Sequence, residues 1–170
     1  MGAMMIENTL AMLLNMPGMM LIIGALAVPL LPSSIRHGYM LAVIAVSGWS
    51  VWQMSPDQTM TATLAGIDLI LVRAEAITKP FALVFHIAAA LNVIYAMHEN
   101  TKITATAGLA YAGAAIAALF AGDFLTLFIY WELTTFASVF LVLAGNTPRA
   151  TRAAMRYLLM QVASGVILLA

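Results

Sequence analysis

The sequence predicts an all-α polytopic membrane protein, and three observations lead to that fold class. Hydrophobic residues make up 64% of the 170 residues and charged residues only 8%. The mean hydropathy is +1.00, whereas a soluble domain with about 25% charged residues would be far more polar. The apolar residues fall into six segments, at about 10–31, 39–54, 80–98, 105–121, 124–145 and 157–170. We therefore expect about six transmembrane helices.

Three of these helices have marked starts. Thr78 stands just before Lys79-Pro80 and Thr147 just before Pro148, so each places a capping hydroxyl ahead of a proline in the first turn. Asp123 precedes the fifth apolar segment and is expected to cap that helix.

The last segment has two alternative starts. A helix from Tyr157 to Ala170 would be about 21 Å long, against about 30 Å for the hydrocarbon core. On that reading residues 1–170 are the front part of a longer chain. The alternative is a helix that begins at Pro148 and whose arginines reach back to the interface. In either case we treat residues 1–170 as a single transmembrane module.

The connection from about Ser55 to Thr78 is too polar to cross a membrane. Within it, residues 67–77 contain β-branched residues in partial alternation, which predicts a short external strand or hairpin.

The basic residues predict the orientation. With the N-terminus outside, the cytoplasmic connections hold five basic residues, namely Arg36, Lys102, Arg149, Arg152 and Arg156. The external connections hold Arg73 and Lys79 only. This asymmetry follows the positive-inside rule and favours an external N-terminus.

Glu132 is the main candidate for a functional residue. It is the only acidic or basic side chain between Phe124 and Gly145, and it lies roughly 12–14 Å from the start of its helix, close to the bilayer midplane. A carboxylate at that depth costs about 2.5–3.5 kcal/mol, so it needs a partner, a proton or a hydrated cavity. The alternative is a structural role, as a protonated acid bonded to a neighbouring helix.

Three further residues are weaker candidates. Thr135 lies on nearly the same helix face as Glu132 and would either bond the carboxylate or, as we favour, a carbonyl of the preceding turn. His86 lies within the third segment, where a neutral imidazole that bonds a neighbouring helix is favoured over a proton relay. Arg156 either reaches to anionic lipid with the other arginines or lines a cytoplasmic access to the site.

Composition also excludes several classes of function. Seven basic and seven acidic residues cancel, so no basic surface for nucleic acid is expected. The absence of cysteine excludes disulfides, iron–sulfur clusters and thiolate metal sites. We expect no bound cofactor or metal, and any electron carriers would have to lie on other chains.

Two sequence blocks carry a resemblance to a known family. The first is Gly-Asp-Phe-Leu-Thr-Leu-Phe-Ile-Tyr-Trp-Glu-Leu at residues 122–133, and the second is Arg-Tyr-Leu-Leu-Met-Gln-Val-Ala-Ser-Gly at residues 156–165. Together with residues 72–81 they resemble the antiporter-like family shared by Mrp-type multisubunit cation/proton antiporters and the proton-pumping membrane subunits of respiratory complex I. The family usually has an aspartate where this chain has Glu75.

The resemblance implies a fold of about fourteen helices in two inverted repeats, of which this chain would be the front part. It also implies that Glu132 faces a lysine on a later, broken helix. Changing the separation of such a pair changes the proton affinity of the lysine, so the pair would couple proton uptake and release.

Three functions follow from these expectations. The first is a subunit of a Mrp-type antiporter that exchanges protons for Na⁺ or K⁺, together with other membrane subunits and lipids, in the bacterial cytoplasmic membrane. The second is a proton-pumping subunit of a redox enzyme related to complex I or hydrogenases, and only this reading makes the chain part of an enzyme. The third is a scaffold module that transports nothing.

Overall fold

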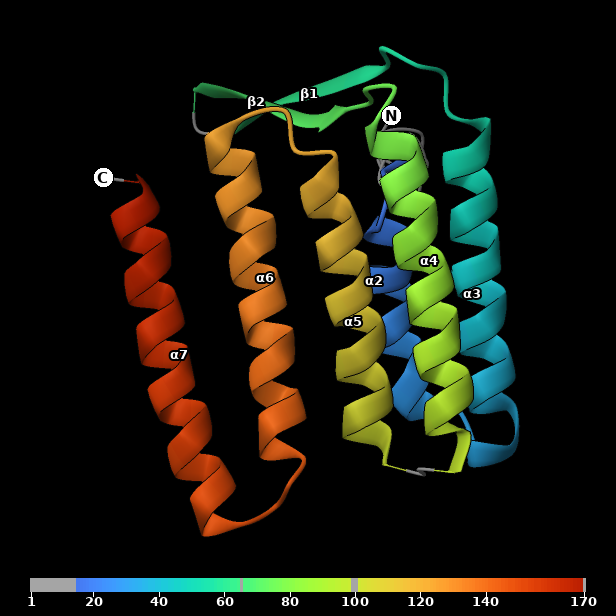
Figure 1. Ribbon diagram of the computed structural model, residues 1–170, viewed down its shortest axis with the longest axis vertical. Helices are drawn as coiled ribbons and strands as arrows, with labels where there is room; N and C mark the ends of the chain where they lie inside the picture. The colour runs from blue at the N-terminus through green and yellow to red at the C-terminus, as the bar shows by residue number, and fades with distance from the viewer. Residues whose placement is uncertain (1–14, 65, 99–100, 170) are drawn as a thin grey trace, which may run out of the picture.

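The computed structural model describes residues 15–64, 66–98 and 101–169, which form a set of upright helices with one β-hairpin (Figure 1). In chain order the elements are α2 (Met19–Ala27), η1 (Val28–Leu30), α3 (Ser33–Gln53), β1 (Thr59–Leu64), β2 (Ile67–Arg73), α4 (Thr78–Tyr95), η2 (Ala96–His98), α5 (Lys102–Leu119), α6 (Phe124–Leu143) and α7 (Pro148–Leu169). The hairpin lies across one end of the helices, and α7 lies at one edge beside α6 (Figure 1).

Four of the described helices are long and apolar enough to cross a membrane. They span Thr78–His98, Lys102–Leu119, Phe124–Leu143 and Pro148–Leu169. These helices correspond to the last four apolar segments of the sequence, and their ends differ from the predicted ends by only a few residues where the start was unambiguous. The described chain therefore has the character of an all-α membrane protein, with the hairpin as its one β element.

The first two segments differ more from the prediction. The described part of the first contains only the short helices α2 and η1, and its residues 10–14 lie outside the described residues. The second segment is helix α3, which begins at Ser33, six residues before the predicted start. This helix is long enough to cross a membrane, but with the polar residues of its first turns it is not among the four membrane-crossing candidates.

Arg36, which the sequence predicts in a connection, belongs instead to the first turn of α3, where it is buried. Its guanidinium donates a hydrogen bond to the carbonyl of Leu31, 3.3 Å away. The backbone of Pro32 is extended, and the helix begins directly after it at Ser33. Arg36 therefore lies within the helix and not in a loop.

Helix starts follow the capping signals at two of the three expected positions. Asp123 caps α6 through a hydrogen bond from the Thr126 amide, and Thr147 Oγ1 accepts one from the Ala150 amide at 3.0 Å. The α7 helix therefore begins at Pro148, and the start at Tyr157 was wrong. The prediction for Thr78 was also wrong, because Thr78 is already the first residue of α4 and makes no cap hydrogen bond.

The polar connection between α3 and α4 folds into an antiparallel hairpin, which confirms the expected β structure. Its second strand, β2, covers the predicted region only as far as Arg73, and β1 supplies a partner strand from residues that were not predicted. A register irregularity falls between Met60 and Thr61.

Three backbone and side-chain contacts anchor the hairpin to the turn between α5 and α6. The Ile70 amide donates to Asp123 Oδ2 at 2.6 Å, and the Ile70 carbonyl accepts from the Gly122 amide at 2.9 Å. The Arg73 amide donates to the Phe120 carbonyl at 2.7 Å. A side chain at Gly122 would overlap Ile70, so this glycine permits the close approach. The start of α6 is thus held by the hairpin.

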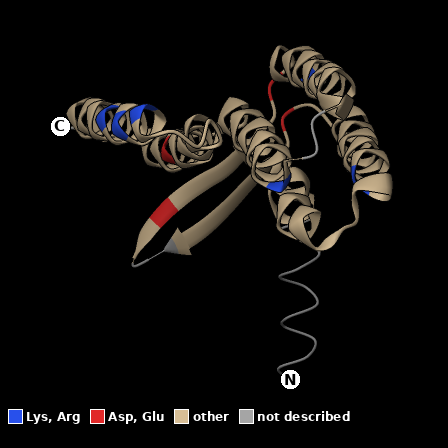
Figure 2. Ribbon diagram, turned by 90° about the horizontal axis from the view of Figure 1, so that it is seen from below, with Lys and Arg blue, Asp and Glu red and all other residues tan. Residues whose placement is uncertain are grey.

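The antiparallel course of the helices separates the basic residues in space. Arg36, Lys102 and the arginines of α7 lie in the first half of helices that begin opposite the hairpin, whereas Arg73 and Lys79 lie at the hairpin end. Figure 2 looks at the molecule from below and shows the Lys and Arg positions of α7 in blue. The described chain therefore has five basic residues toward one end of its helices and two toward the other.

Candidate functional site

Helix α6 positions the candidate residue Glu132. Asp123 fixes the first turn, because its carboxylate accepts hydrogen bonds from the Thr126 amide and the Thr126 hydroxyl, both at 2.8 Å. Glu132 lies eight residues after Phe124, which is about 12 Å along the axis of α6. It is the only Asp or Glu within any helix that the structure describes.

The carboxyl group of Glu132 lies between α6 and α7. The residue is half-buried, and its Oε1 atom is inaccessible to solvent. No hydrogen-bond partner for Oε1 is found among the described residues. On the α7 side the carboxyl group approaches Gly165, and the ring of Phe128 lies against the same glycine. The site is therefore a half-buried acid with one buried oxygen that has no hydrogen-bond partner among the described residues.

Thr135 does not serve Glu132. Its hydroxyl donates to the Trp131 carbonyl at 3.2 Å, one turn back, and the hydroxyl of Thr134 donates to the same carbonyl at 2.6 Å. The favoured reading of Thr135, a bond to the preceding turn, is confirmed. The reason is local, because a helical threonine reaches the carbonyl four residues earlier without crossing to another side chain.

His86 makes an interhelical contact far from Glu132. Its ring lies buried between α3 and α4, with Nε2 2.9 Å from Ser47 Oγ and Nδ1 2.7 Å from the Ala82 carbonyl. The carbonyl can only accept, so Nδ1 carries a hydrogen and, in the neutral ring, Nε2 accepts from the serine. This is the neighbouring-helix bond that the sequence favoured for His86.

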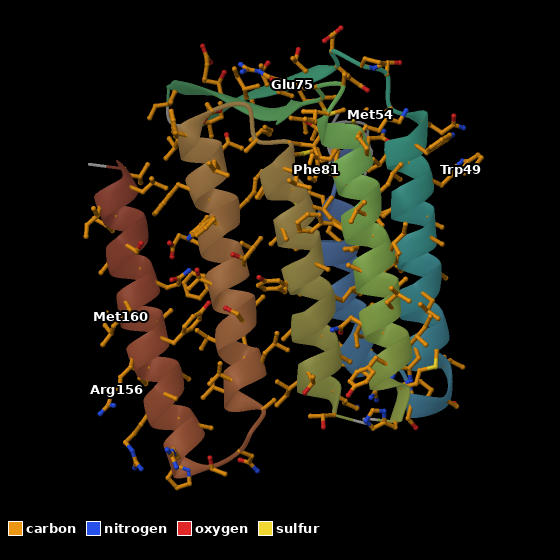
Figure 3. The ribbon with its side chains drawn as sticks, viewed as in Figure 1. Trp49, Met54, Glu75, Phe81, Arg156 and Met160 are labelled. Carbon is orange, nitrogen blue, oxygen red and sulfur yellow. The ribbon has the colours of Figure 1, made fainter. Side chains whose placement is uncertain are left out.

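Arg156 lies exposed on α7, on the side away from α6 together with Met160 (Figure 3). Nine residues separate it from Gly165, about 13 Å along the helix axis. The structure therefore does not bring Arg156 to Glu132, and its position fits the reading in which the arginines of α7 face lipid head groups.

Three residues of the α6–α7 contact were not predicted from the sequence. Tyr157 Oη and Ser138 Oγ lie 2.9 Å apart and join the two helices nearer their basic end. Gly165 is the only glycine of α7 and, with Ala154, one of its two buried residues. A glycine inside a long helix is itself a signal, but the sequence does not say which residue lies opposite.

Two cavities lie away from the carboxyl group. One of about 540 Å³ lies among α3, α4 and α5 and has His37 and Asn92 in its lining. The other, of about 380 Å³, lies between α5 and α6 and has Lys102 at its edge. Glu132 lines neither of them. Across residues 15–64, 66–98 and 101–169 no cluster of three or more histidine or acidic residues could bind a metal ion.

Comparison of the chain with models of protein families found no match, and comparison with curated proteins found none either. The resemblance to antiporter-like subunits therefore rests on the two sequence blocks, which contain Glu132 and Gly165 respectively.

Proposed function

We propose that the chain is a membrane subunit of a Mrp-type cation/proton antiporter, in which Glu132 takes part in coupling proton movement to Na⁺ or K⁺ movement. One observation carries the proposal: the only acid within the described helices has a buried oxygen without a partner among the described residues. This acid also lies within the sequence block that resembles the antiporter-like family.

The observation matters because a charge within the membrane has a high electrostatic cost. A carboxylate within a membrane-crossing helix costs about 2.5–3.5 kcal/mol, and a bonded partner would offset part of that cost. The described helices offer Glu132 no basic side chain, since α6 contains none and those of α7 lie toward its start. The proposed partner is a lysine from the rest of an antiporter-like fold, as the resemblance implies.

The finer points of the fold belong to the same proposal. They are six spans in residues 1–170, a place in a fold of about fourteen helices with inverted repeats, an external N-terminus and the bacterial cytoplasmic membrane. The basic end of the helices and the four membrane-crossing candidates support them.

The functional test replaces Glu132 in the assembled protein. Glu132→Gln keeps the size and hydrogen-bonding capacity but cannot carry negative charge. In membrane vesicles we expect normal amounts of protein and at least a tenfold loss of cation-driven proton movement, equivalent to about 1.4 kcal/mol in the limiting barrier. Glu132→Asp should retain part of the activity, because the charge remains.

Glu75→Gln is the matched control, because Glu75 is exposed and lies outside the helices. It should leave transport unchanged. Parental transport by Glu132→Gln across the working pH range would show that the acid is structural. Proton movement that requires an electron donor instead of a cation gradient would favour the redox-driven pump.

Orientation has a separate test, because the chain contains no cysteine. Single cysteines at Ser34, Thr61 and Thr147 sample the two ends of the helices. A membrane-impermeant thiol reagent added outside intact cells should label only Thr61→Cys, in the hairpin. Labelling of Ser34→Cys or Thr147→Cys from that side would contradict the proposed orientation.

A further inference from the structure

Gly165 lies where α7 meets the carboxyl group of Glu132. A Cβ atom built on Gly165 would overlap Glu132 Oε1 and would lie 2.9 Å from the Phe128 ring and 3.4 Å from the Glu132 Cδ atom. Contacts below 3.0 Å require something to move. The contact between α7 and Glu132 therefore leaves no room for a side chain at residue 165.

The glycine is costly for the helix that contains it. A glycine in a helix interior is less stable than alanine, because it loses more backbone freedom on folding. The helix α7 has four alanines and no other glycine over its 22 residues. Its single glycine lies opposite the single acid of α6. Helix propensity does not explain a glycine at this position, but the contact with Glu132 does.

We propose that Gly165 is a positioning residue, whose missing side chain lets α7 cover the Glu132 carboxyl group and hold it between the two helices. The inference rests on the proposed function only for its consequence, which is that the position of α7 controls access to the coupling acid. The packing itself is independent of what the acid does.

The shielding has a direct chemical readout. A hydrophobic carbodiimide, dicyclohexylcarbodiimide, reacts from the lipid phase with a carboxyl group that it can reach, and the adduct is measured by mass spectrometry of the Glu132 peptide. In Gly165→Ala the added methyl group must displace the carboxyl group, the Phe128 ring or α7. The proposal predicts that the carboxyl group moves and becomes accessible from the lipid phase. We expect the adduct to form at least threefold faster than in the parent assembly, with Glu132→Gln as the blank.

Gly108→Ala is the matched control, because Gly108 lies within α5 and a Cβ atom there would meet nothing within 4 Å. It changes helix propensity in the same way without touching Glu132, so its labelling rate should equal that of the parent. An unchanged rate in Gly165→Ala, or an equal increase in Gly108→Ala, overturns the proposal.

A size exchange tests the contact by rescue. Glu132→Asp shortens the side chain by one methylene, which leaves room for the methyl group of Gly165→Ala. The double variant should label at the rate of Glu132→Asp alone, and its transport should exceed that of Gly165→Ala by at least twofold. Additive losses in the double variant would mean that the methyl group acts through some contact other than the carboxyl group.

If Gly165→Ala fails to accumulate in the membrane, the same question is answered in a Glu132→Ala background. There the carboxyl atoms are gone, so Gly165→Ala should accumulate at the level of Glu132→Ala. Continued failure would assign the clash to Phe128 and overturn the proposal. A changed labelling rate in Gly165→Ala together with full transport in Glu132→Gln would support the positioning role and contradict the proposed function. An unchanged labelling rate together with lost transport in Glu132→Gln would contradict the positioning role and support the proposed function.

Discussion

His86 lies between α3 and α4, whereas Glu132 lies between α6 and α7, and the hydrogen bonding of these two side chains differs. His86 in the first pair has a bond to each ring nitrogen, one from its own helix and one from Ser47 on the neighbouring helix. Glu132 in the second pair has a buried oxygen with no partner in the described residues. A buried polar group whose hydrogen bonds are complete stabilises the fold, whereas one left without a partner costs about 1–3 kcal/mol of desolvation.

The helices around the two residues differ in the same sense. The α3–α4 pair belongs to the bundle of α2 to α5, whereas α7 has α6 as its main neighbour and exposes most of its large apolar side chains (Figure 1). Glu132 therefore lies in the less enclosed part of the described chain, between α6 and the exposed edge helix α7.

The largest expected difference between the pairs is in transport. We expect His86→Gln to retain at least half of the parental proton movement, because glutamine can still bond Ser47 or the Ala82 carbonyl, while Glu132→Gln loses at least tenfold. The measurement is cation-driven proton movement in vesicles with matched protein amounts. A tenfold loss in His86→Gln would place His86 on the proton path and end the contrast.

The next effect concerns the start of α6. Asp123→Ala removes the cap and the bond from the hairpin, and should lower the free energy of unfolding by about 1–2 kcal/mol. Asp123→Asn keeps one acceptor oxygen for the capping bond from the Thr126 amide, but its NH2 group cannot accept from the Ile70 amide, so it should lose only part of that stability. Equal losses in the two variants, measured by denaturant unfolding in detergent, would show that the capping bond from the Thr126 amide contributes nothing.

The same residue predicts a pH dependence. Burial alone would raise the pKa of Asp123, but hydrogen bonds from the Thr126 amide, the Ile70 amide and the Thr126 hydroxyl outweigh it and lower the pKa below its ordinary value of 3.8. A carboxyl group whose pKa is lower in the folded state stabilises the fold above the unfolded pKa. Its contribution is therefore lost as the pH falls below about 3.8, through the folded pKa, and this part of the acid sensitivity should vanish in Asp123→Asn.

The smallest effect is that of the histidine's partner. Ser47→Ala removes the hydroxyl that contacts Nε2 and should destabilise the protein by about 0.6 kcal/mol, the usual size of an interhelical hydrogen bond in membrane proteins. A loss above about 2 kcal/mol would show that Ser47 and His86 belong to a larger buried network. Thermal unfolding in detergent, with Ser50→Ala on the same helix as control, measures this difference.

Local residue patterns were enough for part of this molecule. The apolar segments, the caps at Asp123 and Thr147 and the β-branched run after Gly66 depend on neighbouring residues, so they were readable in the chain. The Thr78 cap and the start of α3 were not predicted correctly, because helix ends depend on neighbouring turns as well as on the capping residue.

For the site, the sequence by itself determined that an acid stands deep in an apolar helix, because a single charge in such a run is visible in the residues alone. Only the tertiary structure decided what surrounds it. That Gly165 lies over Glu132, Ser47 beside His86 and Ile70 beside Asp123 depends on the rotation and axial register of separate elements. These are set by the packing of whole faces against each other, and no local pattern of residues specifies them.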